Sequence, residues 1–495
     1  MLDKNNQYQY MKLIIDTEVL KCLFEGNIEK DINKVINKII PDNRSPLRKS
    51  IDLERVVVRE RVLALFDVDV SRYEGDRKKL SACIKELLNS TRPPLPVLTT
   101  IKQACASCPA EHLEVSNICQ GCFARPCTTN CPKDAIYFKN GKAMIDQSKC
   151  IKCNKCLERC PYHSIVRSCI PCENACPVGA IKQNENGVSQ VDHTKCIACG
   201  RCIASCPFGA VVPRSSLISV ANLIKNKQKT VAIIAPAIVG QFNASLEKIK
   251  KAIKEVGFTE VIEVAEGAEI TSINEAKELM ERKENNEGYL LTSCCPAWVM
   301  LVEKHIPLLK EHISKTLSPM GYTIELAEKR FPGYKIIFVG PCIAKREEAA
   351  VKYPNRVHSV ITYEELSAIF KAKNIDFLNI SESPEDWDKC KSFDDCRDFA
   401  LKTGVAECVL NRVDDRNKYK VLSFSGIDKK LFMQMKIWPK LPPDADIIEI
   451  MACPDGCISG PGTIVNPQNA IRFRDSEKKR LDSEKTKSTN NECSK

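Results

Sequence analysis

Residues 150–161 read CIKCNKCLERCP, and residues 196–207 read CIACGRCIASCP. Both segments fit the spacing C-x₂-C-x₂-C-x₃-C-P. Three cysteines on one tight loop can hold three corners of a [4Fe–4S] cube, and the fourth cysteine, before the proline, reaches a neighbouring cube. Zinc sites usually contain separate C-x₂-C pairs, so an unbroken run of four cysteines favours iron–sulfur clusters over zinc.

A less regular run precedes each of these segments. The first upstream run is stretched between its second and third cysteines, and the second has Val166 where its first cysteine would stand. The phrases CPKDAI, CPVGAI and CPFGAV also repeat along this part of the chain, which indicates an internal duplication. The block therefore resembles two tandem two-cluster ferredoxin modules. The upstream cysteines are Cys119, Cys122, Cys127, Cys131, Cys169, Cys172 and Cys176.

Pairing each loop with the last cysteine of its partner run gives three complete sets of ligands and part of a fourth. Cys105 or Cys108 could complete the fourth set, and three accessory clusters rather than four is the alternative. The sets are Cys119, Cys122, Cys127 and Cys160; Cys150, Cys153, Cys156 and Cys131; Cys196, Cys199, Cys202 and Cys176; and Cys169, Cys172 and Cys206.

Composition supports metal binding rather than disulfide bonding. The chain has 495 residues and 28 cysteines, 17 of them between Cys105 and Cys206. Its start, MLDKNNQYQYMKL, lacks the apolar core of a secretory signal, and no apolar run reaches the roughly 18 residues of a membrane span. We therefore expect a cytoplasmic protein with no membrane association, whose cysteines serve as metal ligands.

The formal net charge of +11 does not by itself predict a nucleic-acid partner. A four-thiolate [4Fe–4S] cluster carries about two negative charges, so five such clusters would contribute about −10. Acidic and basic residues also alternate, as in KRLDSEKTK, which is typical of a solvated surface. We expect no nucleic-acid binding.

The two ends of the chain carry no recognisable chemical motif. Residues 1–100 have helical apolar spacing and end near a proline-rich linker at 92–96. We interpret them as a small helical packing domain, with a docking or cap role as the alternative. Residues 476–495 are polar and charged, which predicts a disordered tail.

From about residue 216 the pattern changes to alternating strands and helices. TVAIIAP at 230–236 predicts a buried strand, and Phe242, Leu246, Ile249 and Ile253 predict one face of the following helix. EVIEVA, GYLLTS, YKIIFVG and ADIIEIMA predict further strands. Such alternation favours parallel strand pairs covered by helices.

Cysteines directly follow three of these predicted strands. Cys294 and Cys295 follow GYLLTS, Cys342 follows YKIIFVG, and Cys453 and Cys457 follow ADIIEIMA. Ligands of open α/β sheets bind outside the carboxyl ends of the strands. We therefore expect the three loops to converge on one site, although each cysteine taken alone would suit a buried apolar position.

These three loops resemble the signatures of the [FeFe]-hydrogenase catalytic domain. The first is TSCCPAW at 292–298, the second PCIAKREE at 341–348, and the third EIMACPDGC at 449–457. The resemblance covers roughly residues 216–475. It implies a multidomain α/β and α+β protein with a helical N-terminal segment (1–100), ferredoxin-like modules (101–215), an α/β catalytic domain (216–475) and a tail (476–495).

The resemblance implies an H-cluster, which is a [4Fe–4S] cube joined through a cysteine sulfur to a diiron unit with CO, CN⁻ and a bridging dithiolate. By position, Cys457 would be the bridging ligand and Lys345 would donate a hydrogen bond to a cyanide. Met451 would lie beside the diiron unit. The remaining implied cube ligands and pocket residues are Cys295, Cys342, Cys453, Ala235, Pro236, Ala237, Pro296 and Pro341.

A proton path is implied in the same way. Cys294 matches the thiol that supplies protons, and Ser314 and Arg282 match relay positions. Glu275 and Glu278 match the relay glutamates and, three residues apart, share one helix face. Without the resemblance, an exposed charged face would be the preferred interpretation.

Several residues depart from the common family pattern. Gly340 precedes Pro341 where many members have methionine, Met320 stands where many have glutamine, and the third signature continues as Gly460-Pro461-Gly462. These departures resemble group B of the family and alter the surroundings that tune redox potential. Cys390, Cys396 and Cys408 match no ligand position.

The expected function is reversible formation of H₂ from protons and electrons, with a ferredoxin-like electron carrier as partner and maturation proteins supplying the diiron unit. A sensor of H₂ or redox state built on the same domain is one alternative. An iron–sulfur assembly or electron-transfer protein without H₂ turnover is another, which the intact TSCCPAW disfavours.

Overall fold

The computed structural model describes residues 7–26, 28–43, 45–46, 48–71, 80–88, 96–381 and 395–492. Most of the predicted linker at 92–96, together with Cys390 and Cys493, lies outside these residues. Among the described helices, none combines the length and the apolar character that crossing a membrane requires.

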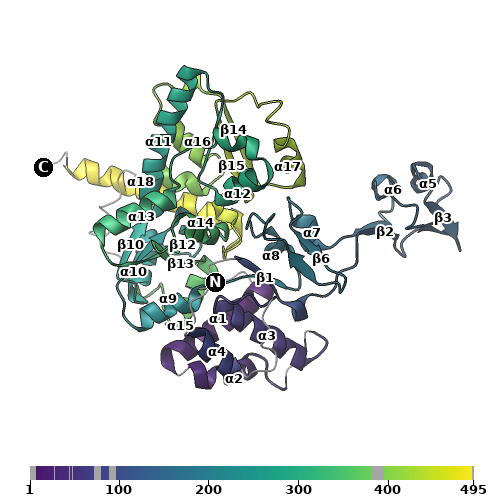
Figure 1. Ribbon diagram of the computed structural model, residues 1–495, viewed down its shortest axis with the longest axis horizontal. Helices are drawn as coiled ribbons and strands as arrows, with labels where there is room; N and C mark the ends of the chain where they lie inside the picture. Colours follow the sequence, from purple (N-terminus) through teal and green to yellow (C-terminus); the bar gives the residue numbers. More distant parts are fainter. Residues whose placement is uncertain are drawn as a thin grey trace.

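Four helices in the described part of residues 7–88 pack against the domain beyond residue 216. Buried Leu20, Ile32, Leu63 and Ile84 fill the space between them. The first helix also packs on α15 and α9, so its apolar residues belong to one core that continues into the domain beyond residue 216. Figure 1 shows these purple helices directly beneath that domain. Their bounds are α1 Gln7–Glu25, α2 Ile28–Ile39, α3 Ile51–Leu65 and α4 Leu80–Leu88, with α9 Leu217–Lys225 and α15 Tyr363–Ala372 as partners.

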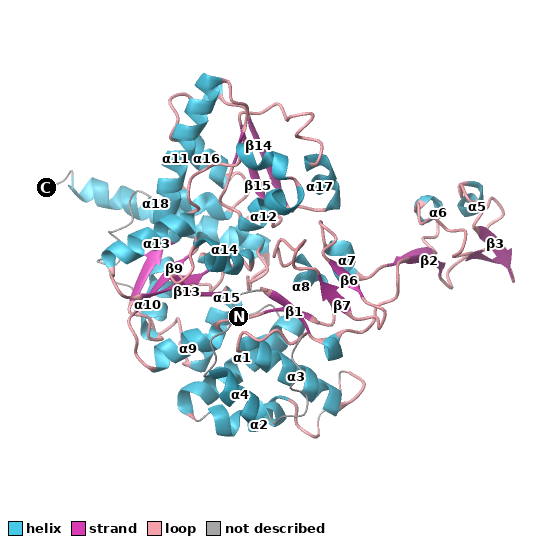
Figure 2. Cartoon of the chain, viewed as in Figure 1, coloured by secondary structure: helices cyan, strands magenta, loops and turns pink. Residues whose placement is uncertain are grey.

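The cysteine-rich region forms two modules, an outer and an inner one. The outer module projects from the body at the end of an antiparallel ribbon, as Figures 1 and 2 show. The inner module packs against the body and begins before the outer one, because β1 pairs with β8. The outer elements are β2 His112–Val115, α5 Pro126–Thr129, β3 Ile136–Lys139, β4 Lys142–Ile145, α6 Lys155–Arg159 and β5 Ile165–Ser168. The inner elements are β1 Leu98–Thr100, α7 Pro171–Ala175, β6 Ile181–Gln183, β7 Ser189–Val191, α8 Arg201–Ser205 and β8 Val211–Pro213.

Two parallel sheets organise the rest of the chain. One has the order β10-β9-β12-β13 and the other the order β11-β15-β14. All five predicted strands are present. The strands are β9 Thr230–Ile234, β10 Glu260–Glu263, β11 Leu290–Leu291, β12 Lys335–Val339, β13 Val357–Ile361, β14 Val421–Ser425 and β15 Ile447–Met451.

Two of these strands, β13 and β14, are not predicted from the sequence. His358 and Ser359 interrupt the apolar run of β13, although Val360 and Ile361 are buried. The edge strand β14 is partly exposed along its whole length, so it lacks the apolar signal of a central strand. The covering helices are α10 Leu246–Glu255, α11 Val264–Asn285, α12 Pro296–His305, α13 Pro319–Arg330, α14 Ala344–Lys352, α16 Gly404–Leu410 and α17 Lys429–Met435.

The C-terminal segment differs from the expected disordered tail. The structure has a helix, α18 Pro467–Glu492, in its place. Ala470 is fully buried, and the helix is tied to the body by ion pairs of Arg474 and Lys478 with Asp398. Tertiary contacts therefore order a segment whose polar composition alone indicates disorder.

A buried carboxylate joins the domain beyond residue 216 to the inner module. Glu365 accepts hydrogen bonds from Arg346 Nη2 at 2.7 Å and from the Thr362 backbone at 2.6 Å, and also from the Ser215 hydroxyl. Desolvation would raise the pKa of Glu365, but the charges of Arg346 and Lys12 hold it below its ordinary value. The carboxylate is therefore charged and almost fully buried.

We expect Glu365→Ala to lower the free energy of unfolding by roughly 3–5 kcal/mol, because it leaves a buried guanidinium without its anion. The exposed pair Arg356–Glu328, at 2.6 Å, provides the control. Glu328→Ala should cost less than about 1 kcal/mol. Denaturant unfolding of both variants checks the difference, and equal losses would contradict it.

Candidate active site

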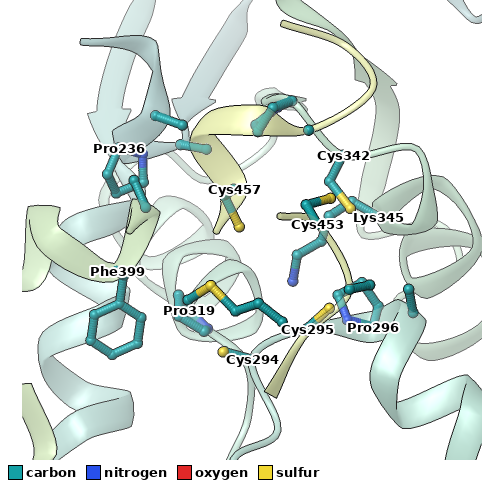
Figure 3. Close-up of a pocket in the computed structure, with 18 of the residues that line it drawn as sticks. Pro236, Cys294, Cys295, Pro296, Pro319, Cys342, Lys345, Phe399, Cys453 and Cys457 are labelled. Atoms are coloured by element: carbon teal, nitrogen blue, oxygen red, sulfur yellow. The ribbon is translucent and has the colours of Figure 1, made fainter. Parts of the chain in front are cut away.

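The three cysteine loops meet at one cavity between the two sheets. The cavity has a volume of about 90 Å³ and an almost entirely apolar lining. Figure 3 shows the cysteine side chains pointing into it from different loops. The predicted residues that line it are Cys294, Cys295, Cys342, Cys453, Cys457, Lys345, Met451, Ala235, Pro236, Ala237, Pro296 and Pro341.

Strand and helix ends fix the positions of the four expected cube ligands. Cys295 is the N-cap of α12, whose first residue is Pro296. Cys342 follows β12, and Cys453 follows β15. The turn to Cys457 passes through Gly456 with φ +96°, where a Cβ would lie 2.7 Å from the Ala400 carbonyl oxygen. Only glycine suits that close approach.

The four thiols share one environment. Desolvation raises the pKa of Cys342 to about 11, with the neighbouring Cys295 adding to the rise. It also raises the pKa of Cys295, Cys453 and Cys457. Four thiols facing one cavity would repel each other as free thiolates, whereas an iron–sulfur cube would neutralise them. The residues therefore fit the group that the sequence implies.

Lys345 places a charged ammonium at the same cavity. Its Nζ lies 2.6 Å from Glu348 Oε2 and 3.3 Å from Ser318 Oγ, and Figure 3 shows the side chain reaching between the cysteines. Desolvation would lower the pKa of Lys345, but Glu348 raises it above its ordinary value. An ammonium has three donors, so it can also bind an anionic ligand in the cavity.

Other lining residues were not predicted from the sequence. Phe399 and Ala400 come from a short 3₁₀ helix, η6 Cys396–Ala400, and Pro319 opens α13. Cys199 of the inner module also lines the cavity. The sequence gives no signal for Phe399, because the segment around it contains no motif and reaches the site only through the fold.

The predicted proton-path residues form a series beside Cys294 that has two hydrogen-bonded parts. Ser293, next to Cys294, donates from its backbone N to Glu275 Oε1 at 3.2 Å. Ser314 Oγ donates to Glu278 Oε2 at 3.0 Å, and Arg282 Nη2 lies 3.0 Å from Glu278 Oε1. The two glutamates share one face of α11, as their spacing predicts.

Glu275 is the most deeply buried member of this series. Its side chain is fully buried, and its Oε2 has no hydrogen-bond partner in the part of the chain that the structure describes. Desolvation raises the pKa of Glu275 to about 7, although Ser293 and Ser314 oppose the rise. Desolvation, together with the charge of Glu275, also raises the pKa of Cys294. Glu275 can therefore gain and lose a proton near neutral pH.

We expect Glu275 to make stability depend on pH. Its pKa is raised in the folded state, so its contribution is fully present below the ordinary value of 4.5 and is lost as the pH rises towards 7. The loss is on the order of 3 kcal/mol. Glu275→Gln should remove this dependence in unfolding measurements at pH 4.5 to 8. The exposed Glu281→Gln on the same helix should retain it; parallel curves for Glu275→Gln and wild type would contradict the assignment.

The structure groups the accessory cysteines largely as the spacing predicts. Cys119, Cys122, Cys127 and Cys160 line one cavity of the outer module. In the second set, Cys131, Cys150 and Cys156 belong to the same apolar cluster as cysteines of the first set, and desolvation, followed by the charges of Cys150 and Cys153, raises the pKa of Cys156. The third set follows in the inner module. Desolvation raises the pKa of Cys196 to about 11 and of Cys199 to about 12, with Cys176 adding to both; it also raises the pKa of Cys202.

The fourth set brings both candidate cysteines together. Desolvation raises the pKa of Cys108, and the charges of Cys105, Cys206 and Cys169 add to it. Cys172 Sγ lies 3.3 Å from Ser189 Oγ, which is also 4.0 Å from Cys105 Sγ. Five thiols therefore surround this position, and the choice between Cys105 and Cys108 stays open.

Comparison with known families identifies the domain around the cavity. Residues 228–461 match the family of the iron only hydrogenase large subunit, C-terminal domain. This part of the chain is an iron-only hydrogenase domain. Upstream, residues 143–166 match a 4Fe-4S binding domain and residues 167–217 match an LdpA Fe-S cluster-binding domain. The predicted family and fold class are confirmed, while the group B assignment stays a prediction.

Relatives of the hydrogenase domain fall into two groups. Iron hydrogenase 1 of Clostridium pasteurianum is 28% identical over 397 residues, covering 68% of each chain. The periplasmic [Fe] hydrogenase large subunit of Nitratidesulfovibrio vulgaris is 28% identical over 390 residues, covering 68% of this chain and 88% of that one. The cytosolic Fe-S cluster assembly factor NAR1 of Scheffersomyces stipitis is 32% identical over 152 residues, covering 26% and 28%.

Proposed function

We propose that this protein catalyses the reversible reaction 2H⁺ + 2e⁻ ⇌ H₂ at an H-cluster. One observation carries the proposal. Five cysteines from the three loops and a buried lysine face one apolar cavity, and a series of polar side chains leads away from it. The match to the hydrogenase family supports the same chemistry.

Each residue at the cavity would have a distinct role. Cys295, Cys342 and Cys453 would hold the cube, and Cys457 would also bridge to the diiron unit. The cluster, when bound, would supply the metal centre at which protons and electrons combine. Lys345 would donate a hydrogen bond to an anionic ligand.

The apolar lining keeps bulk water out of the site. Met451 is 2% exposed, and Pro236 and Phe399 close other sides of the cavity. Residues 235–237 also line the cavity, and a 3₁₀ helix begins there at Pro236. Exclusion of water strengthens the hydrogen bonds that these groups make.

Protons would move between Cys294 and solvent along the series described above. Cys294 would exchange a proton with the reaction centre, and Glu275 would replace it. Ser314 then connects to Glu278, which is partly exposed and pairs with Arg282. The carboxyl with a pKa near 7 suits this step because it titrates close to neutral pH.

Electrons would travel through the two modules. Cys199 lines the active-site cavity, and Cys199 is among the charges that raise the pKa of Cys453 beyond the effect of desolvation. The third accessory cluster would therefore adjoin the H-cluster. We propose four accessory [4Fe–4S] clusters, a ferredoxin-like electron carrier as partner, H₂ and protons as substrates, and maturation proteins that supply the diiron unit in the cytoplasm.

A second candidate function is iron–sulfur assembly without H₂ turnover. The match to NAR1 of Scheffersomyces stipitis, a cytosolic Fe-S cluster assembly factor, favours it. The two functions differ in whether the diiron unit is present. Infrared spectroscopy separates them, because only that unit carries CO and CN⁻ ligands.

We expect matured protein to show CO and CN⁻ infrared bands and to produce H₂ with a reduced electron donor. Cys457→Ala should lose both, because it removes the bridge between the two parts of the cluster. Cys122→Ala in the outer module is the control and should keep the bands. A matured protein without bands would favour assembly, and a Cys457→Ala protein with near wild-type turnover would refute the ligand assignment.

Substitutions at Cys294 separate proton transfer from cluster binding. Cys294→Ala and Cys294→Ser should keep the iron and the infrared bands but lose about 10²–10⁴-fold in H₂ turnover, because neither residue supplies a suitable acid. Cys294→Asp should recover part of the rate. If Cys294 only packs behind the loop, alanine would be the mildest change, and a rate order of Ala above Asp would refute the relay.

A further inference from the structure

Two cysteines outside every predicted ligand set lie against each other behind the active-site cavity. Cys396 begins η6, and Cys408 lies in α16. Their Sγ atoms are 3.2 Å apart, and the two residues are 0% and 1% exposed. Neither lines the cavity. The fold therefore brings together two sulfurs that the hydrogenase chemistry does not use.

A guanidinium group faces both sulfurs. Arg412 Nη1 lies 3.2 Å from Cys408 Sγ, and Nη2 lies 3.3 Å from Cys396 Sγ. Asp395 Oδ2 holds Nη1 at 2.7 Å, and Asp395 Oδ1 lies 3.5 Å from Cys396 Sγ. A cation that donates to sulfur stabilises the thiolate, which is the reactive form of cysteine.

The same atoms do not favour a metal ion. Donor atoms of Asp395, Cys396 and Cys408 all lie within 4.8 Å of one another, which is compatible with a metal site. However, Arg412 already donates to all three residues, so its positive charge occupies the side from which a divalent cation would bind. Two adjacent sulfurs beside a cation instead suit oxidation.

We propose that Cys396 and Cys408 form a site of reversible oxidation, at which hydrogen peroxide converts the two thiols to a disulfide. The Cys408 sulfur attacks one peroxide oxygen, the O–O bond breaks, and a sulfenic acid and one water result. The Cys396 sulfur then attacks that sulfenic sulfur, forming the S–S bond and releasing a second water. The two sulfurs lose two electrons in total, which reduce one peroxide to two waters.

The roles of the two sulfurs follow from their partners. Cys396 Sγ donates to Asp395 Oδ1 at 3.5 Å, which keeps the proton on Cys396, and the hydrogen bond with Cys408, followed by desolvation, raises the pKa of Cys396 in the same direction. Cys408 Sγ instead accepts from Arg412 Nη1 at 3.2 Å, so we assign Cys408 as the attacking sulfur. Peroxide is almost as small as water, and the site lies one layer below the surface, because Asp395 is 34% exposed and Arg412 is 17% exposed.

The disulfide would join two elements of the cavity wall. Phe399, on the same 3₁₀ helix as Cys396, lines the cavity. The start of α16 is bound by Glu449 of the third signature, which accepts from Thr403 N at 2.7 Å and from Ala406 N at 2.8 Å. Oxidation would therefore tie Phe399 to the strand that carries Met451. This inference does not rest on H₂ turnover.

Peptide mapping tests the site directly. The full-length protein is treated with hydrogen peroxide at doses that leave the visible absorbance of its clusters unchanged, alkylated, and digested with trypsin without reduction. Cleavage after Lys391, Arg397 and Lys402 places Cys396 and Cys408 in separate peptides, 392–397 and 403–412. We expect the mass of these two peptides joined, increasing about tenfold with peroxide and disappearing after dithiothreitol.

Three variants make the result specific. Cys408→Ser should abolish the linked peptide. Arg412→Met, which keeps the bulk but removes the charge, should slow formation of the link about tenfold while circular dichroism stays unchanged. Because this variant loses the cleavage after residue 412, its link is measured on the longer peptide 403–416. Cys83→Ser is the matched control and should leave the link intact, since Cys83 is another buried cysteine with a guanidinium nearby, Arg59 Nη2 at 3.8 Å.

Other outcomes would overturn the proposal. Recovery of both Cys396 and Cys408 in alkylated form after peroxide would show that the pair is inert. A link from Cys390, whose tryptic peptide is separate, would show a different partner. One zinc ion per chain bound in dialysis against zinc chloride and lost in Cys396→Ser would show a metal site instead.

Discussion

Parallel strands all end on the same side of their sheet, and two such sheets here direct their carboxyl ends towards one cavity. Ile234 of β9 pairs with Val339 of β12, and Leu291 of β11 pairs with Ile448 of β15, so the loops that follow these strands leave at matching heights. This constraint brings cysteines from positions more than 150 residues apart in sequence to one place. The loop lengths and the helix N-caps then determine the exact position of each sulfur, whereas the pairing of the strands brings the sulfurs to the same cavity.

Charge in the interior depends on the same arrangement. Lys345 stays protonated because it forms an ion pair with Glu348, one helical turn later on α14. Glu365 stays ionised because it forms an ion pair with Arg346, the residue after Lys345 on the same helix. Glu275, by contrast, accepts hydrogen bonds from Ser293 but has no cation bound to it among the described residues, and it keeps its proton to a higher pH. The protein therefore buries both charged and neutral acids. Ion pairing fixes some of them, and its absence leaves one free to titrate.

The sequence predicts what is encoded by local spacing. The cysteine runs, the five apolar strands and the cysteines after three of them are contiguous patterns, and they indicate both the ferredoxin-like modules and the convergence of the loops. Long-range packing is not encoded in this way. Phe399 reaches the cavity, Cys396 meets Cys408 and Cys199 joins the cavity lining only through tertiary contacts. Helix α18 has a polar sequence, and ion pairs with Asp398 order its first turns.

The outer module also differs from a simple tandem repeat, because it is nested within the inner one. The chain leaves the body along β2 and returns along β5, with His112 opposite Ser168. Departure and return therefore occur at the same point, as they do where one domain has been inserted into the surface loop of another. Loss or replacement of residues 112–168 would leave the ends of the inner module close together. The module is thus an interchangeable part, through which evolution can lengthen, shorten or replace an iron–sulfur extension without remodelling the two sheets around the cavity.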